Sequence, residues 1–156
     1  MLTILGIEDS SELDLDLARA RLRVRVLVVD DDAAVLSMVA KSLVAAGFAV
    51  ATAHGGNDAL VAIREQPEAI DLLLTDVVMP EMDGAALACK VREIVPNLPI
   101  LLMSGFADIA TRHGPLIAKP FKPAALIAMI DSLLSLERRA PGREEPEDKP
   151  GATRSA

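Results

Sequence analysis

The stretch VRVLVVDDD at residues 24–32 decides the fold of this chain, because a near-continuous apolar run ends abruptly in three acids. An apolar run that does not alternate with polar residues is typical of a strand buried on both faces. The segment that follows, AAVLSMVAKSLVAAG at 33–47, has apolar residues at helical spacing and ends in Gly47, a residue common where helices terminate. A doubly buried strand followed by a helix predicts the first unit of an α/β fold.

The same alternation of apolar runs and helical patterns continues to about residue 136. Further strands are predicted at 48–53, 69–75, 99–103 and 115–118, and further helices at 56–65, 83–94, 106–113 and 123–136. Five such strands and five helices predict a flavodoxin-like, doubly wound parallel sheet with strand order 2-1-3-4-5, in which the fourth helix is short. In sheets of this kind, ligands bind at the carboxyl ends of the strands, where the strand order reverses.

Length and composition predict one domain between two peripheral ends. The chain has 156 residues and is 51% hydrophobic, which suits one ordinary domain with its own core. We expect that domain at residues 23–136. Residues 1–22 are an N-terminal extension that is partly helical or flexible, and residues 137–156, rich in proline and charge, are a disordered tail. No effector domain is expected after the folded domain.

Composition and charge argue against several classes of function. The formal net charge is −7 and aromatic residues make up 2% of the chain. Both values argue against a nucleic-acid surface, which needs clustered Lys and Arg and aromatic rings for stacking. No apolar run approaches the roughly 18 residues that span a bilayer, and the acidic first residues are no secretory signal. We therefore expect a cytoplasmic protein without nucleic-acid or membrane partners.

The single cysteine and the two histidines belong to no recognisable metal-binding or catalytic motif. Cys89 is the only cysteine, so the chain has no intramolecular disulfide and no cysteine-based zinc site. We expect Cys89 to be a small, buried or half-buried residue of its helix. His54 and His113 are expected to be ordinary surface residues without partners at ligand spacing.

Acidic residues follow two of the predicted strands at their carboxyl ends. Asp30, Asp31 and Asp32 follow the first strand and Asp76 follows the third, and these two strands are neighbours in the predicted order. Carboxylates that lie so near one another raise one another's pKa values unless a cation neutralises them. Mg²⁺ binds carboxylates, waters and phosphate oxygens. An isolated run of three aspartates would be read as a solvated loop, but Asp76 at the adjacent strand end favours a Mg²⁺ site.

Two further strand ends carry polar side chains. Ser104 follows the fourth strand and Lys119 the fifth. Alone, they would be read as a turn residue and a surface lysine. Beside a metal-bound carboxylate, a hydroxyl and an ammonium are what phosphoryl transfer to that carboxylate requires, with Asp76 as the attacking nucleophile.

Four segments resemble, in order, the motifs of the receiver domain of two-component response regulators. They are VLVVDDDAAVL (26–36), DLLLTDVVMPEMDG (71–84), ILLMSG (100–105) and IAKPF (117–121). The resemblance covers about residues 23–136. Its most specific parts are the DxxMPxMDG and KPF stretches, and their joint occurrence is more specific still.

The resemblance implies a role for each of the residues singled out above. Asp76 is expected to be the phosphoacceptor, Ser104 the switch hydroxyl and Lys119 the lysine that pairs with the phosphate. The Lys119–Pro120 bond is often cis in this family. The oxygen ligands implied for Mg²⁺ belong to Asp30, Asp31, Asp76 and the backbone carbonyl of Val78.

The sequence departs from the family pattern around the switch region. Leu116 stands three positions before Lys119, where the family often has a switch aromatic, so the familiar inward movement of a ring is not expected. Ser104 lies only 15 positions before Lys119, which shortens the fourth helix. Val78 and Phe106 occupy positions that shape the access of water in the family, and both are apolar. We therefore predict slow self-dephosphorylation.

The resemblance implies a domain that accepts a phosphoryl group from a phosphohistidine partner, a histidine kinase or histidine phosphotransfer protein. It would then switch its binding to an unknown downstream protein, as a monomer or weak dimer, and catalyse only its own phosphorylation and dephosphorylation. The alternatives are an unphosphorylated pseudo-receiver that only binds proteins, or the receiver portion of a hybrid histidine kinase. A phosphatase with an aspartate nucleophile is disfavoured, because Ala34 stands where the haloacid-dehalogenase signature needs Thr or Val.

Overall fold

The computed structural model describes residues 15, 19–105 and 113–139 of the chain. Within them, one all-parallel sheet has the order β2-β1-β3-β4-β5, which confirms the predicted order. Its strands are β1 (Arg25–Val29), β2 (Ala49–Ala53), β3 (Leu72–Asp76), β4 (Ile100–Ser104) and β5 (Leu116–Ala118). The strand order reverses between β1 and β3, so the carboxyl ends of these two strands form the switch point at which ligands bind in doubly wound sheets.

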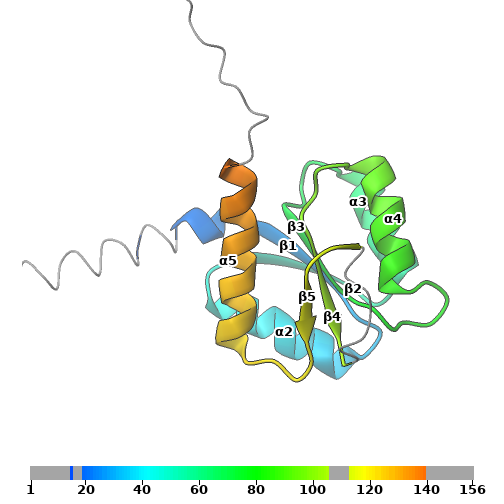
Figure 1. The fold of residues 1–156 in the computed structure, drawn as a ribbon, viewed down its shortest axis with the longest axis horizontal. Helices are drawn as coiled ribbons and strands as arrows, with labels where there is room; N and C mark the ends of the chain where they lie inside the picture. Colours follow the sequence, from blue (N-terminus) through cyan, green and yellow to red (C-terminus); the bar gives the residue numbers. More distant parts are fainter. Residues whose placement is uncertain (1–14, 16–18, 106–112, 140–156) are drawn as a thin grey trace, which may run out of the picture.

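Helices cover both faces of the sheet (Figure 1). They are α2 (Ala33–Ala45), α3 (Gly56–Glu65), α4 (Gly84–Ile94) and α5 (Pro123–Arg139). Helices α3 and α4 pack over one face and α2 and α5 over the other, each pair closing its own hydrophobic cluster. The predicted short helix at 106–113 lies outside the described residues, apart from its last position. Helix α5 begins at Pro123, as predicted for the last helix.

The strands form because their side chains enter two cores alternately. Leu73 faces the α3 and α4 cluster, whereas Leu72 and Leu74 face the α2 and α5 cluster. All the residues of β3 and β4 are buried. The absence of polar alternation, from which a doubly covered sheet is predicted, therefore reflects burial of successive side chains on opposite faces.

Polar caps and one glycine set the ends of two helices. Asp32 is the N-cap of α2, where its carboxylate accepts hydrogen bonds from the backbone of Ala34 at 2.9 Å and Val35 at 3.4 Å. Asp83 caps α4 in the same way, accepting from Ala86 at 2.7 Å. Gly47 follows α2 with a φ of 104°, a conformation that a residue with a Cβ adopts only with strain.

Helical structure is present on both sides of residues 23–136. Residues 19–22 form a helical turn before β1, and Arg21 in this turn binds Asp131 of α5 with an Nη2–Oδ2 distance of 2.7 Å. Helix α5 continues to Arg139, three positions past residue 136, the predicted end of the domain. The rest of the tail lies outside the described residues, as does the remaining extension apart from Leu15. None of the described helices has the length and apolar character needed to cross a membrane.

Candidate functional site

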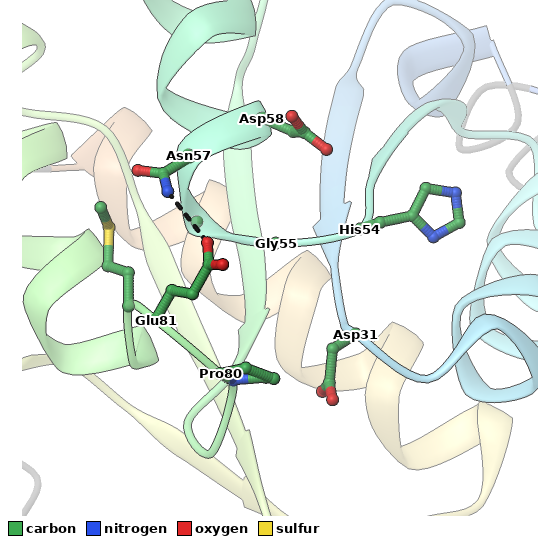
Figure 2. Close-up of a pocket in the computed structure, with 9 residues that line it drawn as sticks. Asp31, His54, Gly55, Asn57, Asp58, Pro80 and Glu81 are labelled. Carbon is green, nitrogen blue, oxygen red and sulfur yellow. Dashed lines mark hydrogen bonds between the residues drawn. The ribbon is translucent and has the colours of Figure 1, made fainter.

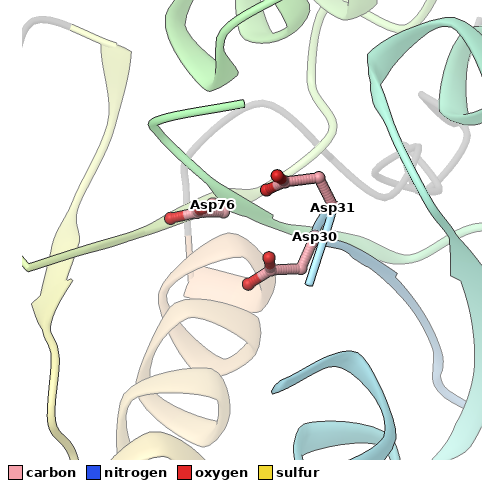
Figure 3. A group of neighbouring side chains, drawn as sticks. All are labelled: Asp30, Asp31 and Asp76. Carbon is pink, nitrogen blue, oxygen red and sulfur yellow. The ribbon is translucent and has the colours of Figure 1, made fainter. Parts of the chain in front are cut away.

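Three carboxylates meet at the switch point of the sheet (Figure 3). Asp30 and Asp31 directly follow β1, and Asp76 is the last residue of β3. The register of the two strands pairs Val29 with Thr75, which brings the next residue of each strand together. One oxygen from each of the three carboxylates lies within 4.8 Å of the others. The predicted cluster of Asp30, Asp31 and Asp76 is therefore present in the structure.

The run of three aspartates divides into three different environments. Asp30 is 1% exposed, and its Oδ1 accepts a hydrogen bond from the backbone N–H of Asp32 at 2.9 Å. Asp31 is exposed and adjoins Asp30 and Asp76. The carboxylate of Asp32 is engaged as the cap of α2. Only the first two aspartates of the run are therefore members of the cluster.

Lys119 bridges two of the carboxylates. Its Nζ lies 3.0 Å from Asp30 Oδ2 and 3.2 Å from Asp76 Oδ1. The lysine directly follows β5, and its bond to Pro120 is cis. Its side chain is half-buried. A residue that is 43 positions from Asp76 along the chain is thus held at hydrogen-bond distance by the parallel sheet.

Ser104 and Val78 complete the set of predicted site residues. Ser104 is the last residue of β4 and is 1% exposed. Its carbonyl accepts a hydrogen bond from the backbone N–H of Lys119 at 2.7 Å, which ties the ends of β4 and β5 together. Val78 lies two residues beyond Asp76 with its side chain 57% exposed. The other residue expected to limit water access, Phe106, lies outside the described residues.

The electrostatics of the site reflect an excess of negative charge. The pKa of Asp76 is raised above its ordinary value, first by burial and then by the charge of Asp30, while Lys119 and the backbone N–H of Val77 oppose the rise. For Lys119, burial lowers the pKa, but hydrogen bonding to Asp30 and the charges of Asp30 and Asp76 outweigh it and raise the pKa. Three carboxylates share one ammonium, so the site favours an additional cation.

The donor set fits Mg²⁺. All three clustered side chains offer carboxylate oxygens, which are the ligands that this hard cation prefers. Within the described part of the chain, no other group of three or more histidine, cysteine or acidic side chains has the spacing to hold a metal ion. Two negative charges remain after pairing with Lys119, and a divalent cation would balance them.

A polar cavity of about 270 Å³ adjoins the cluster (Figure 2). It lies between the loop after β2 and the loop after β3, and Asp31 belongs both to its lining and to the carboxylate cluster. Asn57 donates a hydrogen bond to Glu81 across it at 3.4 Å. His54 lines the cavity and is exposed, as expected for a surface histidine.

Sequence reasoning missed two residues that hold the backbone of Asp76. The hydroxyl of Thr75, which is fully buried, donates to the carbonyl oxygen of Asp76 at 2.9 Å. Gly84 packs against the same carbonyl, since a Cβ at this position would lie 2.3 Å from that oxygen. The glycine closes the DxxMPxMDG motif and could have been singled out from it. The threonine carries no comparable sequence signal.

The prediction that Cys89 is buried or half-buried was wrong, and His113 has contacts that the sequence did not indicate. Cys89 is exposed, because it lies on the side of α4 that faces away from the sheet. Its Sγ is 3.6 Å from Nδ1 of His113, and the carbonyl of His113 accepts a hydrogen bond from Arg92 of α4. His113 is therefore held against α4, and both contacts join residues more than 20 positions apart.

Leu116 stands at the position where the receiver domain family often has a switch aromatic. It begins β5, is half-buried and packs against the hydrophobic cluster beneath α3 and α4. An aliphatic side chain in the core therefore takes the place of a mobile ring.

Fold and site define a doubly wound α/β protein that gathers carboxylates and a lysine at the carboxyl edge of its sheet. The family model for the response regulator receiver domain matches residues 26–131. The chain therefore belongs to the response regulator receiver domain family, which acts in two-component signalling.

Individual relatives agree with this assignment. Over 115 residues, 69% of this chain and 94% of the relative, the chain is 37% identical to the response regulator receiver protein CpdR of Brucella abortus (strain 2308). Over 126 residues, it is 32% identical to the transcriptional regulatory protein GlrR of Escherichia coli (strain K12), covering 76% of this chain but only 28% of GlrR. Among solved structures, the receiver domain of the hybrid histidine kinase CckA has 34% identity and a TM-score of 0.64, covering 70% of this chain and 98% of that one.

Proposed function

We propose that this chain is a phosphoacceptor, which receives a phosphoryl group from a phosphohistidine onto Asp76 with Mg²⁺ bound beside it. The observation that carries the proposal is the position of Lys119, whose Nζ lies 3.2 Å from Asp76 and 3.0 Å from Asp30. A carboxylate paired with a lysine and adjoined by two further carboxylates combines a nucleophile with the charges that phosphoryl transfer needs. The donor is a histidine kinase or a histidine phosphotransfer protein.

Each residue of the site has its own role in the proposed phosphoryl transfer. A carboxylate oxygen of Asp76 forms a bond to phosphorus while the bond from phosphorus to the donor's imidazole nitrogen breaks, and the imidazole leaves with the electron pair and takes up a proton. Lys119 pairs with the phosphoryl oxygens, and the hydroxyl of Ser104 donates a hydrogen bond to one of them. Bound Mg²⁺, held by Asp30, Asp31, Asp76 and the carbonyl of Val78, supplies further positive charge to those oxygens. The domain then catalyses only its own phosphorylation and dephosphorylation.

Phosphorylation would change the segment between Ser104 and Lys119, because both residues contact the phosphoryl group and their backbones are hydrogen-bonded to each other. Leu116 is packed in the core, so the proposed change proceeds without an aromatic ring. The changed segment would alter binding of a downstream protein. The cytoplasmic location stays a prediction.

A second candidate is the receiver portion of a hybrid histidine kinase. It is favoured by the 34% identity to the receiver domain of CckA, which is itself a hybrid histidine kinase. In both candidates the chemistry at Asp76 is the same, and only the connection of the domain to the kinase differs.

Incubation of the chain with acetyl phosphate and Mg²⁺ tests the phosphoacceptor proposal, with the phosphorylated fraction measured by intact mass. We expect stable label on the wild type and none on Asp76→Ala. Asp58→Asn is the matched control, because Asp58 is an exposed aspartate of α3 outside the carboxylate cluster. Absence of label on the folded wild type would support the pseudo-receiver, and multiple turnover of an added phosphate ester would support a phosphatase.

A further inference from the structure

The backbone after the phosphoacceptor is fixed by a series of contacts. The N–H of Val77 donates to the carbonyl of Met103 at 3.0 Å, and the carbonyl of Val77 accepts from the N–H of Gly84 at 2.8 Å. The carbonyl of Asp76 accepts from the hydroxyl of Thr75 at 2.9 Å. The peptide between Asp76 and Val77 is therefore held at both its oxygen and its nitrogen, and the next peptide is held at its oxygen.

The side chain of Thr75, which donates the hydrogen bond to the Asp76 carbonyl, lies in an apolar environment. Its side chain is on the same face of β3 as Leu73, which belongs to the cluster beneath α3 and α4. Burial of a hydroxyl is costly unless it finds a hydrogen-bond partner, and an aliphatic residue would meet the packing requirement without that cost. Thr75 is 0% exposed, and its hydroxyl donates to the main chain at the start of the loop that leads to Val78.

We propose that Thr75 is a positioning residue for the metal site, which fixes the peptide after Asp76 and thereby aims the Val78 carbonyl and the Asp76 carboxylate at Mg²⁺. This inference rests on the proposed function. Gly84 supports the same geometry from the other side, because any Cβ there would meet the Asp76 carbonyl. Without the Thr75 hydroxyl, the Asp76 carbonyl would lose its hydrogen bond while the Val77 N–H would keep its bond to Met103. The peptide would then be less tightly fixed, and the ligand oxygens on either side of it would lose part of their alignment.

The test compares Mg²⁺ affinity among conservative variants by isothermal titration calorimetry. Thr75→Val keeps the β-branched shape and removes the donor, whereas Thr75→Ser keeps the donor. We expect the valine variant to bind Mg²⁺ about fivefold more weakly, the effect of losing one neutral hydrogen bond, and the serine variant to recover most of the affinity. If the valine variant does not fold, Thr75→Ala is used in its place.

Leu73→Val is the control for disturbed packing, because it removes volume from a buried position on the same face of β3 and removes no hydrogen bond. It should lower the melting temperature and leave the Mg²⁺ affinity unchanged. Wild-type affinity in the valine variant would overturn the inference, as would a loss of affinity in Leu73→Val equal to that in Thr75→Val. If the wild type itself binds no Mg²⁺, the proposed function fails first, so the two failures are distinguishable.

Discussion

At Asp76, the same arrangement that suits a cation opposes ionisation when no cation is present. The side chain of Asp76 is 12% exposed, and one of its oxygens lies within 4.8 Å of an oxygen from each of two other carboxylates. Its pKa is raised in the folded protein by burial and by Asp30, so the folded state binds a proton at Asp76 more tightly than the unfolded state does. The ionised form therefore costs stability above the folded pKa, and that cost disappears as the pH falls toward the ordinary value of 3.8.

Asp76→Asn should accordingly raise the melting temperature of the metal-free protein at neutral pH by a few degrees, since the amide has nearly the same shape and no charge. The gain should shrink on acidification, because the wild-type carboxyl then becomes neutral as well. Melting curves in EDTA across a pH series provide the measurement, with Asp58→Asn as the control for loss of an exposed charge. A lower melting temperature for Asp76→Asn at neutral pH would contradict the sign of the argument.

Val78 leads to a prediction about the lifetime of the phosphoryl group. Its side chain is apolar and 57% exposed two positions after Asp76, so it offers attacking water no hydrogen bond. We expect phosphate to be lost slowly from the wild type and severalfold faster from Val78→Asn, whose amide can orient water. The decay of the phosphorylated mass after removal of the donor measures both rates. Loss of the phosphoryl group from the wild type within seconds would contradict the prediction.

At the scale of elements, Arg21 joins the turn before β1 to two helices. Its guanidinium pairs with Asp131 of α5 at 2.7 and 3.3 Å and donates to the carbonyl of Ala46 at the end of α2 at 3.3 Å. It also lies 5.6 Å from the centre of the Phe48 ring. Ion pairs that are partly exposed, as this one is, contribute little individually, but a planar guanidinium with several partners contributes more.

Arg21→Ala should lower the free energy of unfolding by about 1 kcal/mol. Urea denaturation measures this loss, and Asp131→Asn should reproduce part of it, with non-additive effects in the double variant. Arg23→Ala is the control, because Arg23 is exposed and carries the same charge in the same turn. Equal losses for the two arginine variants would show that the contacts of Arg21 contribute nothing specific.

The elements were largely predictable, because burial of a whole strand is visible in its composition. Helix α2 begins at Ala33 and α3 spans Gly56–Glu65, as predicted. Strand β3 was predicted at 69–75 but runs from Leu72 to Asp76, since a parallel ladder with β4 pairs Asp76 with Met103. Asp76 is therefore the last strand residue, a position set by pairing rather than by composition.

At the scale of the whole molecule, the carboxylate cluster would link the proposed Mg²⁺ binding to folding, because its members come from the ends of two strands, and Asp30 and Asp76 are 46 positions apart. An ion that binds only the folded state stabilises it by mass action, by about 1.4 kcal/mol at ten times its dissociation constant. Millimolar Mg²⁺ should thus raise the melting temperature by several degrees, and Asp31→Asn should reduce the shift. An unchanged melting temperature in the wild type would weaken the case for a metal site.

The sequence by itself indicated the strands, the helices and the residues at the strand ends, because continuous apolar runs and their terminal acids are local patterns. The sheet order followed from the class of fold that this alternation indicates. The sequence also indicated Asp76, Ser104 and Lys119 through motifs. Tertiary structure decided how the three consecutive aspartates differ. Only packing makes Asp30 the partner of Lys119, Asp31 an exposed member of the carboxylate cluster and Asp32 a helix cap.

Packing also decided the contacts of Thr75 and Arg21. Arg21 meets Asp131 across 110 positions of chain, and the role of the Thr75 hydroxyl depends on how the loop after β3 turns back. Such contacts depend on side-chain direction and on neighbours that are distant along the chain. Composition and periodicity carry no record of either, which is the physical reason that the sequence could not supply them.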